Sequence, residues 1–498
     1  MQLSTRKILR LNFSSFGRGQ NMSDELAIKL NECTTKGYVI APAGYGKTHL
    51  IALAVRASVD RQLILTHTFS GVNSIKSKMT ALGVPAFKYQ VDTIASWSLR
   101  LCLAYPKTSA WKTENPTSKQ WNKLYECCAG LLEKKFIRHV VTATYAGIYV
   151  DEYQDCSDTQ HSLVCALAKF LPCRILGDPM QAIFDFGEGK PVDWDMSIYP
   201  TFDCVGQLET PWRWMNAGEP ELGAWLKEAR KKIEQGQKID LLGEKPPSVI
   251  RVQTDPKYLD VKQYSSLCAL LGHNESVIAL LGGDQKSKNK THRMAQKMAG
   301  RFSSIEEVEG KALHSFLKKF EAAKSGHAGF LIALDFAKKC FTGVGNALTT
   351  GTKRGEVAKQ SKGTKYPVVL QAANGYLNNP TSCHLKSFFV ALKANPETSV
   401  YRRDLLYRFF NVLKMHIVGE GATLTEAATL YQREMRHTGR PINHRKLIGT
   451  TLLVKGLEYD HAVILDADAL DAKDLYVAMT RGSKSLTIIG TGRYLPGK

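Results

Sequence analysis

The feature that most constrains this chain is a glycine-rich loop between an apolar strand and a helix. The run GYVIA at 37–41 leads into the loop, and HLIALAVRA continues after it as a helix. Small residues let backbone N–H groups approach phosphate closely, and a helix N-terminus favours negative charge. Such a stretch also arises by chance, but the strand before it and the helix after it are the context that a phosphate site requires. The loop residues are Ala41, Pro42, Ala43, Gly44, Tyr45, Gly46, Lys47 and Thr48.

This loop predicts that Lys47 holds the β- and γ-phosphates of a nucleotide and that Thr48 gives its hydroxyl to Mg²⁺. Two adjacent carboxylates, Asp151 and Glu152, follow a second apolar strand. Phosphoryl transfer needs a metal-binding aspartate and a group that orients and deprotonates water, so we assign the first role to Asp151 and the second to Glu152. Alone, this pair would be an ordinary solvated strand end; together with the loop it indicates a nucleotide hydrolase.

Further apolar runs alternate with helical patterns along the chain, which predicts α/β folds with parallel sheets covered on both faces. The alternation forms two groups, one before about residue 212 and one from about 245 that resumes after about 445. The segments 96–144 and 301–440 have a different, mostly helical character and are predicted to be insertions. The predicted strands lie at 37–41, 63–67, 147–150, 173–177, 276–282, 461–467 and 485–490.

Composition excludes several classes of protein. The 67 Lys and Arg against 46 Asp and Glu give a formal charge of +21, which suits an anionic partner such as nucleic acid. The 11 cysteines form no C-x-x-C pair, so neither a zinc site nor a disulfide framework is indicated. No signal peptide and no apolar run of about 18 residues is present, so we expect a cytoplasmic protein without a membrane partner.

The motif DEYQD at 151–155, followed by GDPMQAIF at 177–184, resembles the second and third motifs of UvrD/Rep-like superfamily 1 helicases. Further matches follow in the family's order and span residues 41–484. They are Thr66-His67-Thr68, Thr93-Ile94-Ala95-Ser96, Pro211-Trp212-Arg213, Val454-Lys455-Gly456-Leu457-Glu458-Tyr459-Asp460 and Leu475-Tyr476-Val477-Ala478-Met479-Thr480-Arg481.

The resemblance implies an α/β protein with two RecA-like P-loop NTPase lobes, ATP between them and a nucleic-acid strand across them. The first lobe is expected at 1–95 and 145–212, with a reduced insertion at 96–144. The second is expected at 213–300 and 441–498, with a reduced helical insertion at 301–440.

The resemblance also assigns roles around ATP and Mg²⁺. Gln181 is expected to sense the γ-phosphate, and Arg213 and Arg481 to stabilise charge on the transferred phosphoryl group. Trp212 occupies the position beside adenine; the less favoured alternative is a core aromatic, since large aromatic residues are usually buried. The ribose is expected near Gly456 and Glu458.

On the strand-binding side, the resemblance places Phe184 and Phe186 where bases stack. Without the family, two apolar residues at i and i+2 would indicate one face of a short strand. The other expected nucleic-acid contacts are His67, Thr68, Thr93 and Lys455.

The chain departs from the family in ways that leave two functions open. Asp185-Phe186-Gly187 lacks the family's basic residues, and Leu26 stands near where an adenine-reading Gln is usual. The short insertions resemble the helicase-like subunit of Gabija-type phage-defence systems. We therefore expect either an ATP-dependent helicase that moves 3′ to 5′ on single-stranded and tailed duplex DNA, or a DNA-sensing ATPase that switches a partner nuclease. An unrelated P-loop enzyme, such as a small-molecule kinase, would require the later motifs to be accidents.

Overall fold

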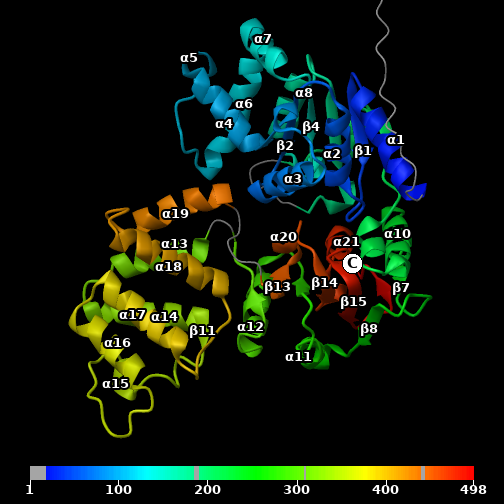
Figure 1. Ribbon diagram of the computed structural model, residues 1–498. Coiled ribbons are helices and arrows are strands. Elements are labelled where there is room, and N and C mark those ends of the chain that lie inside the picture. Colours follow the sequence, from blue (N-terminus) through cyan, green and yellow to red (C-terminus); the bar gives the residue numbers. More distant parts are fainter. Residues whose placement is uncertain (1–17, 184–189, 308–309, 439–443, 498) are drawn as a thin grey trace, which may run out of the picture. The chain divides into compact units, whose positions relative to one another are not determined.

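The computed structural model describes residues 18–183, 190–307, 310–438 and 444–497 (Figure 1). The described residues of Met1–Pro179 and Asp185–Trp212 form one unit, and those of Met180–Phe184 and Arg213–Lys498 form a second. Each unit contains a six-stranded sheet whose neighbouring strands are all parallel. The predicted fold class, two RecA-like α/β lobes with parallel sheets, is confirmed. The exact lobe and insertion boundaries stay predictions.

The first sheet has the strand order β3-β2-β4-β5-β1-β6. Its central strands are short and almost wholly buried, as expected of a parallel sheet covered on both faces. The strands are β1 (Lys36–Ile40), β2 (Gln62–Thr66), β3 (Tyr89–Thr93), β4 (Gly147–Val150), β5 (Cys173–Gly177) and β6 (Asp203–Gln207). The helices are α1 (Arg18–Glu32), α2 (Lys47–Ala57), α3 (Phe69–Ala81), α4 (Ile94–Ala104), α5 (Pro106–Ser109), α6 (Trp121–Leu132), α7 (Lys135–Thr144) and α8 (Asp158–Leu167).

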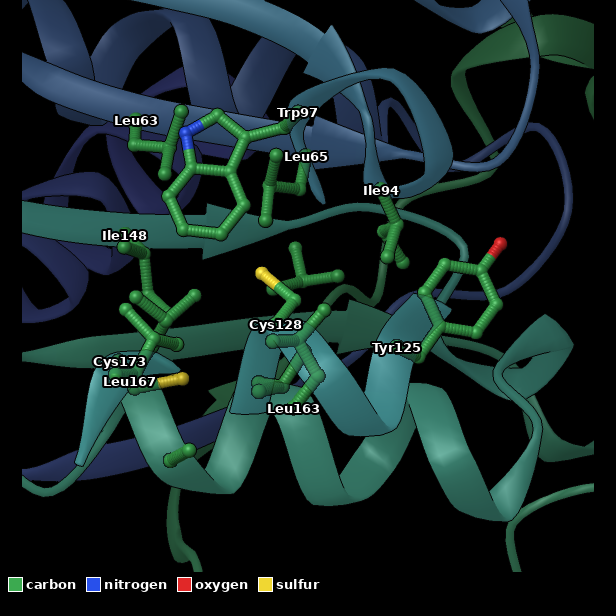
Figure 2. Packing of buried hydrophobic residues seen from close by; sticks show 14 of the residues in the cluster. Leu63, Leu65, Ile94, Trp97, Tyr125, Cys128, Ile148, Leu163, Leu167 and Cys173 are labelled. Carbon is green, nitrogen blue, oxygen red and sulfur yellow. The ribbon is translucent and has the colours of Figure 1, made fainter. Parts of the chain in front are cut away.

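One face of this sheet packs against α4, α6 and α8 (Figure 2). Leu63 and Leu65 of β2 lie in this cluster with Trp97 of α4 and Cys128 of α6. Side chains alternate across a strand, so the buried Ile64 points to the other face. Residues 96–144, predicted to be an insertion, therefore supply α6 and most of α4 to the core of the first unit.

The second sheet has the strand order β10-β13-β9-β14-β15-β8. Its strands are β8 (Val249–Gln253), β9 (Val277–Leu281), β10 (Ser303–Ser304), β13 (Lys446–Thr450), β14 (Tyr459–Ile464) and β15 (Gly482–Gly490). The helices of this α/β part are α9 (Trp212–Asn216), α10 (Pro220–Glu234), α11 (Leu259–Ala269), α12 (Gln285–Lys297), α20 (Thr451–Val454) and α21 (Ala472–Met479). A two-residue pairing joins β7 (Ile239–Asp240) to β16 (Tyr494–Leu495).

The rest of the second unit is helical and has a core of its own. Phe316, Phe336, Phe389 and Phe409 are all buried there, with ring centroids of Phe316 and Phe336 4.0 Å apart. The helices are α13 (Lys311–Glu321), α14 (Gly326–Cys340), α15 (Thr350–Lys353), α16 (Pro367–Asn378), α17 (Ser382–Ala394), α18 (Arg403–Ile417) and α19 (Leu424–Thr438), with β11 (Phe341–Thr342) paired to β12 (Ser399–Val400).

A buried ion pair lies where this helical part joins the second sheet. The Arg402 guanidinium donates two hydrogen bonds, both 2.6 Å long, to the Glu306 carboxylate. Such bidentate geometry is what allows two charges to remain ionised away from water.

Within the described residues, no helix combines the length and the apolar character needed to cross a bilayer.

Candidate functional site

The predicted nucleotide-handling residues of the first unit follow parallel strands of one sheet. The phosphate loop follows β1, and Asp151 and Glu152 follow β4. Between these strands lies β5, which is followed by Asp178, a residue with no predicted role. The carboxyl ends of parallel strands meet at one edge of a sheet, which is where ligands of open α/β sheets bind. The fold thus brings together groups that lie more than 100 positions apart in the chain.

Backbone conformation explains the glycines of the loop. Gly44 and Gly46 have φ values of 77° and 88°, in the left-handed region that glycine enters without a steric penalty. Gly46 is the N-cap of α2 and places no side chain over the helix N-terminus. A Cβ on Gly46 would lie 3.4 Å from Cδ1 of Trp212, so the Trp212 indole borders the loop. The role of Trp212 beside adenine stays a prediction.

Lys47 begins α2 and contacts both predicted carboxylates. Its Nζ lies 2.5 Å from Oε2 of Glu152 and 3.6 Å from Oδ1 of Asp151. Burial alone would lower the pKa of Lys47, but the two carboxylates outweigh burial and hold it above its usual range. Burial raises the pKa of Asp151 to about 6, although the Lys47 ammonium acts in the opposite direction. These groups thus hold a charged ammonium between two carboxylates.

Glu152 is held in place by Gln154, a residue of the DEYQD motif with no predicted role. The Gln154 amide nitrogen donates to Glu152 Oε2 at 2.6 Å, and its oxygen accepts the backbone N–H of Asp178 at 2.9 Å. Gln154 is 1% exposed. Its place in the DEYQD motif was visible in the sequence, but its double contact depends on β4 and β5 being neighbours.

The backbone around this contact is tightly constrained. Glu152 has φ 55°, a left-handed conformation rare for a residue with a side chain and typical of functional sites. A Cβ on Gly177 would lie 2.7 Å from Trp194 and 2.8 Å from Oε1 of Gln154. Gly177 is therefore required for Gln154 to sit against the strand end.

These observations fit a Mg²⁺–nucleoside triphosphate. The loop glycines leave room for phosphate, and α2 presents an N-terminus that no side chain caps. The half-buried Thr48 and the buried Asp151 offer the hydroxyl and carboxylate oxygens that Mg²⁺ prefers.

The remaining predicted ATP residues, other than Trp212, lie in the second unit. Arg481 is 2% exposed; its Nε donates to the Val477 carbonyl at 2.9 Å, and its Nη2 lies 3.5 Å from Oε1 of Gln181. Arg213 forms an ion pair with Glu458 and donates to the carbonyl of Thr480. Both guanidinium groups are thus fixed by the fold, as charge-stabilising donors need to be.

The remaining predicted residues of the second unit, and the residues predicted to contact nucleic acid, lie in several different elements. Lys455 donates to the backbone carbonyl of Gln181, and Gly456 has φ 79°. The Thr68 and Thr93 hydroxyls act as N-caps of α3 and α4, and His67 Nε2 lies 3.6 Å from the Cys156 sulfur. Their roles in nucleic-acid binding stay predictions. The predicted base-stacking residues, Phe184 and Phe186, lie outside the described residues.

Comparisons with known proteins add a family match. Residues 113–193 match the model of the UvrD/REP helicase N-terminal domain, a segment that holds Asp151, Glu152 and Gln181. No curated protein matches the chain. Among solved structures, the arterivirus nonstructural protein 10 helicase with DNA is 14% identical, covering 51% of this chain and 49% of its own, with a TM-score of 0.26. The Escherichia coli DEAH/RHA helicase HrpB is 12% identical, covering 58% of this chain and 31% of its own, with a TM-score of 0.31. This chain thus spans half or less of the length of each.

Proposed function

We propose that this UvrD/Rep-like chain, which carries a helicase-family domain, uses ATP hydrolysis to move 3′ to 5′ along single-stranded DNA and to separate tailed duplexes. The observation that carries the proposal is the group formed by Lys47, Asp151, Glu152 and Gln154 at the carboxyl edge of the first sheet. The family match and the ordered motifs support the coupling to DNA.

In this proposal, Thr48 and Asp151 would hold Mg²⁺, which would offset negative charge on the phosphates of bound ATP. Lys47 is paired with Glu152 in the structure. The β- and γ-phosphates would compete for the Lys47 ammonium and so release the Glu152 carboxylate. Glu152, still held by Gln154, would then take the proton from the attacking water.

Arg213, Arg481 and Gln181 would act on the γ-phosphate side. Guanidinium groups stay charged and present fixed donors, which suits the charge that develops on the transferred phosphoryl group. The aromatic groups predicted to face the strand would bind it without sequence preference, because every base has a π-face. The predicted hydroxyl groups would contact the phosphates, which carry no sequence information.

The proposal is tested by steady-state ATP hydrolysis with single-stranded DNA, with RNA of equal length and with neither. Strand separation is measured on duplexes with a 3′ or a 5′ tail. We expect DNA to stimulate hydrolysis and the 3′-tailed duplex to separate. The Lys47→Ala variant is the control, because it should bind DNA but neither hydrolyse ATP nor separate strands.

A purified chain whose ATP hydrolysis does not respond to single-stranded DNA would refute the motor. Stimulation without separation of either duplex would instead favour the DNA-sensing ATPase that switches a partner nuclease. In that case, addition of the partner should produce cleavage that depends on ATP and on Lys47.

A further inference from the structure

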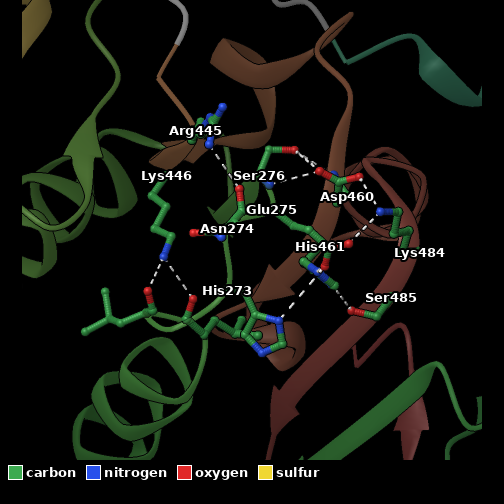
Figure 3. Close-up of polar contacts among 12 residues, drawn as sticks. His273, Asn274, Glu275, Ser276, Arg445, Lys446, Asp460, His461, Lys484 and Ser485 are labelled. Carbon is green, nitrogen blue, oxygen red and sulfur yellow. Dashed lines mark hydrogen bonds and ion pairs between the residues drawn. The ribbon is translucent and has the colours of Figure 1, made fainter.

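A second cluster of ligand-type side chains lies where β9 and β14 begin (Figure 3). His273 and Glu275 belong to the segment before β9, and His461 lies in β14, directly opposite Val277 of β9. None of the three is among the residues proposed to bind ATP or DNA. The cluster therefore needs an explanation of its own.

The three side chains face one another closely. The Oε2 atom of Glu275 lies 2.6 Å from Nε2 of His461 and 4.0 Å from Nδ1 of His273. One ligand atom from each of the three lies within 4.8 Å of the others. A tetrahedral ion with bonds of about 2.0–2.1 Å places its ligand atoms about 3.3 Å apart. The separations of 2.6 and 4.0 Å lie on either side of this value, so a rearrangement of these side chains would bring the ligand atoms to the distance that an ion needs.

Neighbouring groups fix the ligand atoms in the orientation that a metal ion needs. Nδ1 of His461 is 2.7 Å from the Ser485 hydroxyl, which leaves Nε2 directed at the cluster. Metal-binding histidines commonly use their second nitrogen in this way. Lys484 contacts Oε1 of Glu275 at 2.5 Å, so Oε2 is the carboxylate oxygen that faces Nε2 of His461.

Lys484 does not neutralise the cluster by itself, because it also lies 3.3 Å from Asp460. The Asp460 carboxylate is held by the backbone N–H and the hydroxyl of Ser276, at 2.9 and 2.7 Å. Two carboxylates thus share one ammonium beside two imidazole rings, whose centroids are 5.4 Å apart. This arrangement accommodates a dication.

We propose that His273, Glu275 and His461 bind one divalent transition-metal ion of the Zn²⁺ class, through two imidazole nitrogens and one carboxylate oxygen. Imidazole suits zinc and cobalt, whereas Mg²⁺ prefers oxygen ligands. The site is therefore chemically distinct from the Mg²⁺ site at Asp151. Three protein ligands leave a fourth position for water. The ion ties the segment before β9 to β14.

The test titrates the full-length chain, stripped with EDTA, with CoCl₂ and follows the visible d–d absorption. It then displaces Co²⁺ with ZnCl₂ in the presence of excess MgCl₂. We expect one Co²⁺ per chain, with the intense absorption of tetrahedral coordination, and no competition by Mg²⁺. His273→Gln and Glu275→Gln should each weaken binding at least about tenfold. Both residues are partly exposed, so these variants should keep the fold, which circular dichroism verifies.

Two controls separate this site from others. His139→Gln removes an exposed histidine that is distant in sequence from His273 and lies in the first unit, so it should leave Co²⁺ binding unchanged. All measurements use a background in which the exposed thiols Cys204 and Cys383 are replaced by serine, so that sulfur ligation cannot contribute. Absence of stoichiometric binding, or equal affinity in wild type and His273→Gln, would overturn the proposal. The readout is independent of ATP hydrolysis, so it stands or fails separately from the proposed motor.

Discussion

Replacing Gln154 with alanine removes two interactions at once, and they should appear in different measurements. The first is the hydrogen bond from the Asp178 N–H to the side-chain oxygen of Gln154. Leaving this buried N–H without an acceptor costs about 1–3 kcal/mol of stability. The second is the bond donated to the Glu152 carboxylate. A hydrogen bond to a charged group contributes about 1.5–3 kcal/mol, and each 1.4 kcal/mol is a factor of ten. If that bond positions Glu152 in the transition state, kcat for ATP hydrolysis should fall about 10- to 150-fold.

The Gln154→Glu variant keeps an acceptor for the Asp178 N–H but places a carboxylate at a buried position beside Glu152. Burying a charge next to a like charge is costly, so both stability in urea and kcat should fall at least as far as in Gln154→Ala. A matched buried amide elsewhere in the chain therefore separates positioning from stability. Gln263→Ala is the matched control, because Gln263 is also a buried amide and donates to the Leu465 carbonyl at 2.7 Å in the second unit. It should lose stability and keep kcat. If Gln154→Ala also keeps its kcat, Gln154 does not position Glu152.

Three further predictions concern single residues. Glu152→Gln should bind a fluorescent ATP analogue but not hydrolyse ATP, because an amide keeps the shape and cannot take a proton; loss of binding would contradict the base assignment. Burial, assisted by the charge of Arg402, lowers the pKa of His292 to about 3. As the pH falls below about 6.5, His292 therefore binds a proton in the unfolded chain but not in the folded one. The free energy of unfolding decreases from that pH down to about 3. When the pH is lowered from 7.5 to 5.5, the free energy of unfolding from urea melts should fall by about 1.4 kcal/mol less in His292→Gln than in wild type. Equal falls in the two proteins would refute the buried neutral state of His292. Arg402→Met leaves Glu306 buried and unpaired, which should cost about 3–5 kcal/mol; the double variant with Glu306→Leu should recover most of it in the same melts.

The sequence predicted the strands at the centre of each sheet and was silent on most of the others. The runs at 63–67, 147–150 and 173–177 correspond to β2, β4 and β5, which are buried on both faces and so are continuously apolar. The edge strands β6 and β8 contain exposed and half-exposed residues and carry no such run. The apolar-run criterion therefore finds a strand only where neighbours cover it on both sides.

The same limit applies to the candidate site. Lys47, Asp151 and Glu152 could be assigned because each follows a strand in a short, recognisable motif. Gln154 could not, because its role arises from the pairing of β4 with β5 and from the bare Cα of Gly177. The cluster of His273, Glu275 and His461 was equally invisible, since its members are up to 188 positions apart and meet only through the β9–β14 pairing.

The separate aromatic core of the helical part has a consequence for how the second unit loses its structure. Its buried phenylalanines belong to a cluster that shares no member with the core of the second sheet. Regions with separate cores can open as independent cooperative units, each with its own free energy. The second unit would then unfold in more than one transition, and the effect of a substitution would appear in the transition of the region that contains it. Hydrogen exchange should resolve α13–α19 as one protection group and the strands of the second sheet as another, with Arg402 and Glu306 exchanging at the boundary.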